Sequence, residues 1–325
     1  MAVATAVITT IGTTTTTGDV TVQDTPPTII IVTYIGNCEH CKRFKSLGPD
    51  YGELPAKNET AKPFEETAID LMGPWKIPVN NVGNIVVHAQ TMIDIASTLV
   101  EIKRIENKTS LHCATIFENE WLSRYPRPLR VLHDPGTEYT GAAFQSMLLR
   151  NGIQSVPTTA KNPQANAVIE RVHLTIANMV RTELCDVPQN TVATAIEIVD
   201  RILASAQYAA RVSIHRTMEI SPGAMVFNRD MILPIPLIAN YNLIREKKQI
   251  AIDEANRKEN LRRRFKDYVV GDKVMIKAWN PGKLQARTFG PFIINQVHTN
   301  GTITIERKPN VYERINIRRV VPYDR

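Results

Sequence analysis

Apolar residues change their spacing several times along the chain, and each change marks a predicted element. Short runs rich in Val and Ile predict strands, which fall at 66–71, 85–90, 98–105, 129–132 and 153–157. Apolar positions three or four residues apart predict helices, which fall at 109–125, 142–151, 164–184 and 192–210. The first strand is expected to end at Gly73-Pro74. Strands that alternate with helices indicate an α/β domain.

The pattern changes again after this domain. Residues 244–266 predict a charge-dense helix with three arginines (262–264) near its C-terminal end, where cations suit the helix dipole. Short Val- and Ile-rich runs separated by Gly and Pro then fill residues 267–325. Asn300-Gly301 lies between two such runs and is a strong hairpin signal. Closely spaced short strands predict a small β-barrel as a second domain.

The N-terminal part of the chain differs from both domains. Residues 1–37 are rich in Thr and low in complexity, and we expect them to be disordered. Cys38 and Cys41 have the spacing of a zinc knuckle, but a closed tetrahedral site needs four ligands. His40 stands between the two cysteines and cannot easily reach the same ion, and no His precedes it. We therefore expect an incomplete Zn²⁺ site at Cys38 and Cys41.

Composition places the chain among soluble intracellular proteins. Four Cys in 325 residues cannot form a disulfide framework, so a reducing compartment is expected. Cys113 and Cys185 are expected to be packed thiols. No apolar run approaches the roughly 20 residues that a membrane-spanning helix needs, so no membrane partner is expected.

Charge is distributed unevenly along the chain. The whole chain has 39 Lys and Arg against 32 Asp and Glu, whereas residues 241–325 have 19 against 9. A basic end on a neutral-to-acidic body indicates a polyanionic partner such as nucleic acid. Ordinary solvated Lys and Arg are the alternative, because charge reports on association and not on fold.

Three acidic residues stand at the ends of predicted elements in the α/β domain. Asp70 ends the first strand, Asp134 follows the strand at 129–132, and Glu170 lies in the first turns of the long helix. A carboxylate beside an apolar core is costly unless it is paired or metal-bound. Oxygen ligands suit Mg²⁺ or Mn²⁺, and two such ions can support an in-line phosphoryl displacement. Taken alone the three carboxylates are a weak signal, because most acidic residues are solvated.

Motifs around these carboxylates resemble those of a known superfamily. Asp134 and Glu170 are separated by 35 residues. Asp134-Pro-Gly-Thr-Glu-Tyr139 and Asn162-Pro-Gln-Ala-Asn-Ala-Val-Ile-Glu170-Arg171 resemble the two downstream motifs of retroviral-type integrases, and Ile69-Asp-Leu-Met-Gly-Pro-Trp75 resembles the upstream one. Among the neighbouring residues, Glu138 is expected to order the loop after Asp134 and not to bind metal, and His133 is expected to be structural.

The C-terminal region resembles one branch of that superfamily. Val270-Gly-Asp-Lys-Val274, Lys283-Leu284, Gly290-Pro-Phe292 and Asn316-Ile-Arg318 resemble the Gly-Pro-Phe module of Ty3/gypsy-type LTR retrotransposon integrases. The four motifs occur in the family's order. The resemblance divides the chain into residues 1–37, a zinc-domain remnant and linker at 38–60, a catalytic core at 61–230, a linker with a charged helix at 231–266, and a barrel at 267–325 that binds DNA or chromatin.

This resemblance implies a fold and a chemistry. The fold is α/β, with a ribonuclease H-like core whose mixed sheet is flanked by helices, followed by a small SH3-like β-barrel. Asp70, Asp134 and Glu170 would hold two Mg²⁺ or Mn²⁺ ions. These ions would activate water to trim the element's DNA ends, and then activate the 3′-hydroxyl that attacks target DNA. The family's N-terminal zinc domain commonly helps integrases to pair, so a complete enzyme is expected to be a homo-oligomer.

Polar and basic residues near the start of the long helix and in the barrel are candidates for contacts to double-stranded DNA. They are Asn162, Gln164, Asn166, Arg171, His173, Lys273, Lys277, Lys283, Arg287, Arg318 and Arg319. Helix capping or ordinary solvation is the alternative for each of them.

Two classes of function remain open from the sequence. The first is an LTR retrotransposon integrase, as a fragment of a Pol polyprotein or as a genomic remnant. The second is a catalytically silent DNA- or chromatin-binding protein that keeps the integrase fold, and a plain nuclease fits the 35-residue gap less well. Function on DNA implies the nucleus, although the arginines at 262–264 are too short a run for an import signal.

Overall fold

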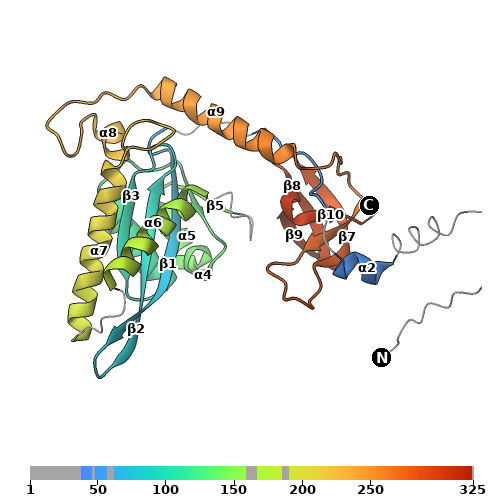
Figure 1. Ribbon diagram of the computed structural model, residues 1–325, viewed down its shortest axis with the longest axis horizontal. Helices are drawn as coiled ribbons and strands as arrows, with labels where there is room; N and C mark the ends of the chain where they lie inside the picture. Colours follow the sequence, from blue (N-terminus) through green and yellow to red (C-terminus); the bar gives the residue numbers. More distant parts are fainter. Residues whose placement is uncertain (1–37, 46–47, 57–61, 159–166, 185–189, 324–325) are drawn as a thin grey trace, which may run out of the picture.

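Two lobes joined by a long helix make up the structure, which is a computed structural model (Figure 1). It describes residues 38–45, 48–56, 62–158, 167–184 and 190–323, with the backbone alone at 167–171 and 183–184. The expectation of disorder for residues 1–37 therefore lies outside the described residues.

The first lobe is built on a five-stranded mixed sheet in the order β3-β2-β1-β4-β5. Its strands are β1 (Glu66–Val79), β2 (Gly83–Asp94), β3 (Val100–Ile105), β4 (Arg130–His133) and β5 (Gln154–Pro157). β1, β2 and β3 pair antiparallel, whereas β4 pairs parallel with both β1 and β5. β1 is therefore the central strand, and it pairs antiparallel with β2 on one side and parallel with β4 on the other.

Helices cover both faces of this sheet. α6 (Ala167–Leu184) and α7 (Val192–Val212) pack on one face, and α3 (Ser110–Phe117), α4 (Thr137–Thr140) and α5 (Ala142–Arg150) lie on the other (Figure 1). Successive residues of a strand point to opposite faces. Ala68 accordingly belongs to the core with α6 and α7, while Ile69 belongs to the core with α3 and α5. Both faces of the central strand are thus buried, as its continuous apolar run indicates.

β1 is longer than the strand predicted at 66–71, because it continues through Gly73-Pro74 to Val79. The register with β2 shifts between Met72 and Trp75, which marks a bulge at this point. Gly73 has a φ of 102°, and a Cβ there would lie 2.8 Å from the backbone oxygen of Val87. The expectation that the strand ends at Gly73-Pro74 is wrong, because the bulge absorbs the residue that cannot pair.

The helices agree with the predicted periods, with two differences at their ends. The helix expected at 109–125 is α3 followed by a π-helical turn at Glu118–Leu122, and Trp121 in that turn is fully buried. The charge-dense helix is α9 (Tyr241–Asn260). Because α9 ends at Asn260, the arginines at 262–264 lie beyond it and do not form its last turn. A short helix, α8 (Pro222–Phe227), was not predicted.

The second lobe is an antiparallel five-stranded sheet in the order β10-β6-β7-β8-β9. Its strands are β6 (Lys273–Lys277), β7 (Thr288–His298), β8 (Thr302–Lys308), β9 (Val311–Asn316) and β10 (Val320–Pro322). β7 and β8 form the predicted hairpin, with His298 paired to Thr302 and Gly301 in the turn at a φ of 74°. The hairpin prediction at Asn300-Gly301 is confirmed.

Residues 38–45 and 48–56 pack on this second lobe, although the whole first lobe separates them from it in sequence. α2 (Glu39–Phe44) lies beside β7, where the backbone N–H of Arg287 donates to the oxygen of Arg43 at 2.7 Å. The hydroxyl of Thr288 donates to the oxygen of Lys42 at 3.0 Å. Leu54 is buried in the apolar core of the barrel. The barrel therefore includes chain from both sides of the α/β core.

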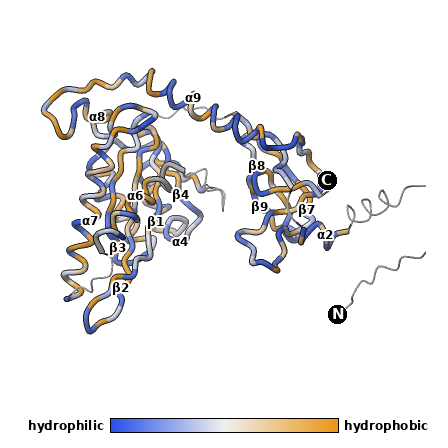
Figure 2. The backbone as a smooth tube through the Cα atoms, in the orientation of Figure 1, coloured by the Kyte–Doolittle hydropathy of each residue, from blue (hydrophilic) through white to orange (hydrophobic). Residues whose placement is uncertain are grey.

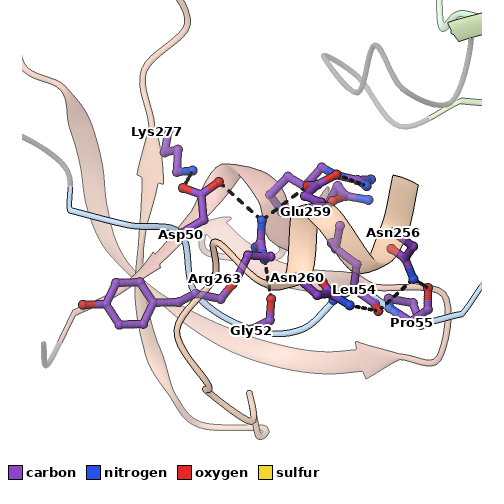
Figure 3. A network of polar contacts seen from close by, with 12 residues as sticks. Asp50, Gly52, Leu54, Pro55, Asn256, Glu259, Asn260, Arg263 and Lys277 are labelled. Carbon is purple, nitrogen blue, oxygen red and sulfur yellow. Dashed lines mark hydrogen bonds and ion pairs between the residues drawn. The ribbon is translucent and has the colours of Figure 1, made fainter. Parts of the chain in front are cut away.

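Arg263 is the centre of this attachment (Figure 3). Its guanidinium donates to the backbone oxygens of Gly52 at 2.5 Å and Tyr51 at 2.6 Å, and lies 3.3 Å from a carboxylate oxygen of Asp50. The second oxygen of Asp50 pairs with Lys277 of β6. Only 1% of the Arg263 side chain is exposed. This arginine holds residues 50–52 against the barrel, which the sequence pattern did not indicate.

α9 contacts both lobes. Near its start, the ammonium of Lys248 donates to the oxygens of Ile95 and Ala96 in the first lobe, at 3.1 and 2.7 Å. Near its end, the side-chain amide of Asn260 bonds both the N–H and the oxygen of Leu54, at 2.9 and 3.1 Å (Figure 3). These contacts fix α9 at each end by side chain–backbone hydrogen bonds.

The connection from α8 to α9 is apolar along much of its length (Figure 2). Ile232 and Ile238 in it are 65% and 86% exposed. An exposed apolar segment of this kind is unlike the rest of the first lobe, whose large apolar residues are mostly buried.

We expect the substitution Arg263→Ala to lower the free energy of unfolding of the barrel by about 2–3 kcal/mol, because two backbone oxygens and Asp50 lose a buried partner. Hydrogen exchange of the β7 and β8 amides measures the stability of this lobe separately from that of the α/β core. Arg262→Ala is the matched control, because Arg262 is exposed and an exposed substitution is expected to change stability by less than about 0.5 kcal/mol. Equal effects of the two substitutions would contradict the assignment.

Candidate functional site

Asp70 and Asp134 lie at the same level of the first sheet, on neighbouring strands. β1 and β4 are parallel, and the last of their paired residues are Ala68 and Leu132. Each aspartate lies two residues further along its own strand direction, so strand pairing brings Asp70 and Asp134 to the same level of the sheet. Asp70 lies within β1 and not at its end, where the sequence pattern predicts it, because β1 continues to Val79.

The surroundings of Asp70 hold its carboxylate in place. One carboxylate oxygen accepts the N–H of Leu71 at 2.8 Å, and the backbone oxygen accepts the hydroxyl of Thr91 at 3.2 Å. Thr91 is the register partner of Asp70 on β2 and is fully buried. About a quarter of the Asp70 side chain, 27%, remains exposed. The carboxylate of Asp70 is therefore fixed by the backbone of its own strand and remains partly exposed.

His173 of α6 also reaches this position. Its Nε2 lies 2.7 Å from the hydroxyl of Thr91, and its Nδ1 lies 3.9 Å from Oδ2 of Asp70. Burial lowers the pKa of His173 to about 4, so the imidazole is neutral near pH 7. Among the candidates for DNA contact, His173 thus faces the first aspartate from within the fold.

Asp134 is held through its neighbour His133. Nδ1 of His133 lies 2.6 Å from the backbone oxygen of Asp134, and Nε2 lies 2.8 Å from the hydroxyl of Ser155 on β5. The N–H of Gly136 donates to a carboxylate oxygen of Asp134 at 3.1 Å. Burial lowers the pKa of His133. His133 is buried and structural, as expected, and it fixes the start of the loop that carries Asp134.

Tyr139 lies close to the two aspartates and was not among the predicted site residues. Its side chain is fully buried, and its hydroxyl has no hydrogen-bond partner among the described residues. Burial is the main cause that raises its pKa well above the usual value, and the nearby Cys113, Asp70, Glu138 and Asp134 raise it further. The phenol therefore stays neutral in the apolar core that α3 and α5 close.

Glu170 lies in the first turns of α6, three residues before His173. Its side chain and that of Arg171 lie outside the described residues, and so do Asn162, Gln164 and Asn166. Among the side chains that are described, no three His, Cys, Asp or Glu groups lie together as a metal site would require. Asp70 and Asp134 are thus placed by the structure, while the third member of the predicted triad is located by its backbone alone.

The basic candidates in the barrel fall into two groups. Lys277 pairs with Asp50, and Arg318 makes a two-pronged contact with Glu259 at 2.7 and 2.9 Å. Burial lowers the pKa of Arg319, which is partly buried. The other group is exposed and consists of Lys273, Lys283 and Arg287. The structure therefore uses some of these charges internally and presents the others to solvent.

Cys38 and Cys41 lie together at the start of α2. The N–H of Cys41 is 3.4 Å from the sulfur of Cys38, and the ring of His40 stacks on Phe44 with centroids 4.6 Å apart. His40 is thus engaged away from the cysteine pair. The expectation of an incomplete zinc site at Cys38 and Cys41 stays a prediction, because a closed site needs two further ligands.

The motifs did not indicate Thr91 or Tyr139 as parts of the site. Thr91 is brought to Asp70 by the β1–β2 register, which no local pattern encodes. Tyr139 belongs to the motif that begins at Asp134, so its proximity was available as a signal, but its burial was not.

Comparison with known proteins places this geometry in context. No protein-family model matches the chain. The chain is 26% identical over 271 residues to the retrovirus-related Pol polyprotein from transposon 412 of Drosophila melanogaster. This match covers 76% of the chain but only 21% of that polyprotein, so the chain spans about a fifth of its relative's length.

A solved structure shares the fold. A chain of the simian T-cell lymphotropic virus intasome, determined in complex with PP2A regulatory subunit B56 gamma, superposes with a TM-score of 0.59 at 13% identity. The match covers 91% of each chain, and so includes both lobes. The predicted fold class is confirmed as a mixed α/β core followed by an SH3-like antiparallel barrel. Together the transposon relative and this fold confirm the resemblance to LTR retrotransposon integrases.

We expect iodoacetamide to alkylate Cys38 much faster than Cys113 in the folded protein at pH 8. Burial raises the pKa of Cys113 to about 11, whereas the N–H of Cys41 lowers the pKa of Cys38. The thiolate is the reactive form, and Cys113 is also fully buried. Peptide mass spectrometry measures both rates, with the urea-unfolded protein as the control in which they should converge. Fast labelling of Cys113 in the folded protein would contradict this packing.

Proposed function

We propose that this chain is a metal-dependent integrase of an LTR retrotransposon, which processes the 3′ ends of element DNA and joins them to target DNA. The observation that carries the proposal is the level placement of Asp70 and Asp134 on β1 and β4, with Glu170 in the helix that crosses the same sheet. The similarity to a transposon Pol polyprotein supports it.

The donor set fits Mg²⁺ or Mn²⁺. Both ions prefer oxygen ligands, and Mg²⁺ commonly binds through one or two carboxylates while it keeps several waters. Asp70 and Asp134 supply such carboxylates, each fixed by a backbone N–H. Zn²⁺ is not part of the proposed chemistry, because Cys38 and Cys41 supply two of the four ligands that a closed zinc site needs.

The residues act by position and charge. When bound, the divalent ions would supply Lewis-acid activation of the attacking oxygen and neutralise charge at the phosphate. Asp70, Asp134 and Glu170 would hold them, while His133 and Gly136 keep the Asp134 loop in one conformation. No covalent enzyme intermediate is required, so the buried Cys113 has no role as a nucleophile.

The proposed partner is double-stranded DNA, bound by exposed cations of the barrel in a homo-oligomer. Lys273, Lys283 and Arg287 are exposed and can contact phosphates. Lys277 and Arg318 are less suited, because acidic groups of the same chain already neutralise them. No helix in the part of the chain that the structure describes is long and apolar enough to cross a membrane.

The direct test is strand transfer of a labelled duplex end into plasmid DNA, with Mg²⁺ or Mn²⁺. We expect product from the wild type and a loss of at least about 100-fold in Asp70→Asn and in Glu170→Gln, because electrostatic stabilisation of the transition state is removed. Glu197 on α7 is exposed, so Glu197→Gln serves as the matched carboxylate change and should keep the activity of the wild type.

Failure of the wild type, together with salt-sensitive DNA binding by every variant, would favour the catalytically silent DNA-binding protein. Product that survives Asp70→Asn would contradict the assignment of the triad. Product from the wild type and Glu197→Gln alone would support the integrase.

Salt dependence tests the proposed DNA surface. We expect Lys283→Ala to reduce the slope of log K against log salt by about 1, because one phosphate contact releases about one counterion. Lys277→Ala should leave the slope nearly unchanged, since Asp50 already neutralises this lysine. Fluorescence anisotropy of a labelled duplex measures both slopes, and an equal decrease in the two variants would contradict the division of the cations.

A further inference from the structure

Gln145 of α5 donates two hydrogen bonds from one side-chain nitrogen. Its Nε2 lies 2.6 Å from the backbone oxygen of Tyr139 and 3.0 Å from the hydroxyl of Ser155 on β5. A carbonyl oxygen can only accept a hydrogen bond, so the amide nitrogen of Gln145, and not its amide oxygen, must face Tyr139. The two hydrogens of this nitrogen allow it to donate in both directions. Gln145 therefore connects the end of α4 to β5.

The bond to Tyr139 holds the end of the loop that begins at Asp134. α4 has four residues and ends at Thr140, and the last carbonyl oxygens of a helix have no N–H partner within that helix. The side chain of Gln145 provides the backbone oxygen of Tyr139 with a donor from α5. The ring of Tyr139 also packs edge-on against Phe144 of α5, with centroids 5.2 Å apart. Both the backbone and the ring of Tyr139 are thus fixed against α5.

The bond to Ser155 reaches the start of the same loop. The hydroxyl of Ser155 lies 2.8 Å from Nε2 of His133, and Nδ1 of His133 lies 2.6 Å from the backbone oxygen of Asp134. A serine hydroxyl can donate or accept, so it bonds Nε2 of a neutral ring and of a protonated ring alike. The connection from Gln145 to Asp134 is therefore independent of the charge on the imidazole.

One glutamine side chain thus holds both ends of the loop at residues 134–139. The N–H of Gly136 also bonds the carboxylate of Asp134, at 3.1 Å, but both of these partners belong to the loop and move with it. Gln145 belongs to α5, whose buried residues pack in the same apolar core as Ile69 of β1. Its two bonds therefore help to set the position of the loop relative to the sheet.

We propose that Gln145 is a positioning residue for the metal site, because it holds the loop at 134–139 and so fixes the carboxylate of Asp134 before a divalent cation binds. The proposal rests on the integrase function proposed above and deepens it by one residue. Gln145 acts through hydrogen bonds and is not itself a ligand. It lies between the motif that ends at Tyr139 and the one that begins at Asn162, so the motifs did not indicate it.

The expected effect of Gln145 is on metal affinity. A ligand that is held in place before binding loses less conformational freedom when the cation arrives. Hydrogen-bond partners that orient metal ligands commonly contribute about 10-fold or more to metal affinity. Loss of the Gln145 donor should therefore weaken the binding of Mn²⁺ and Mg²⁺, although every carboxylate remains.

The first test is hydrogen exchange, which needs neither metal nor DNA. Gln145→Met removes both donated hydrogen bonds and keeps a side chain of similar length that suits a helix. The N–H groups of Gly136, Tyr139 and Thr140 form hydrogen bonds within the loop. We expect these amides to exchange about 10-fold faster in Gln145→Met, because the loop opens more readily once two bonds are lost. The amides of β2 should exchange as in the wild type, which shows that the core is folded.

The second test is the Kd for Mn²⁺, measured with the full chain from the electron paramagnetic resonance signal of free Mn²⁺. We expect Gln145→Met to raise this Kd by about 10-fold or more. Gln154→Met is the matched control and should keep the Kd of the wild type, because the side chain of Gln154 on β5 is exposed. Ser155→Ala breaks the connection to Asp134 and should also raise the Kd. Ser155→Thr keeps a hydroxyl and should bind Mn²⁺ more tightly than Ser155→Ala.

The outcomes separate this proposal from the proposed function. Unchanged exchange of the loop in Gln145→Met would overturn the proposal. Faster exchange with the Kd of the wild type would overturn it as well, because the attachment would then be structural alone. If Asp134→Asn lost Mn²⁺ in either case, the carboxylate site and the proposed function would stand. A wild type that binds no Mn²⁺, or Mn²⁺ binding unaffected by Asp134→Asn, would overturn both.

Discussion

The parallel pairing of β1 with β4 is the contact on which the candidate site depends. It joins a strand near the start of the α/β core to one that follows two helical segments, and it carries Asp70 and Asp134 to one level of the sheet. β1 is held on its other side by β2, which supplies Thr91 opposite Asp70. A slip of one residue in either pairing would turn an aspartate to the opposite face, so the placement of the candidate site depends on the register of three strands.

Burial of both faces of β1 protects that register. Ala68 and Ile69 belong to different apolar cores, one closed by α6 and α7 and the other by α3 and α5. α6 thereby has two roles. Its buried face, with Ile176 and Val180, covers the sheet, and its first turns carry Glu170 and place His173 beside Asp70 of β1.

The barrel differs from the α/β core, because residues that precede the core in sequence form part of it. Leu54 lies in its apolar interior, and Arg263 binds the backbone of residues 51 and 52. The chain consequently leaves the barrel before the core and returns to it along α9. Two connections restrict the orientation of the lobes more than one would. The barrel and its exposed cations are therefore connected to the α/β lobe at two points of the chain.

Short-range patterns in the sequence determined most of the elements and part of the site. The periods of apolar residues predicted β2, α5 and α7, Asn300-Gly301 predicted the β7–β8 hairpin, and the motifs singled out Asp70, Asp134 and Glu170. Each of these signals is contained in a few consecutive residues. Only the tertiary structure decided that β1 passes its bulge, that Arg263 is buried, and that His173 faces Asp70. These features join residues up to 213 positions apart, and such contacts depend on strand register and lobe packing, which local spacing does not encode.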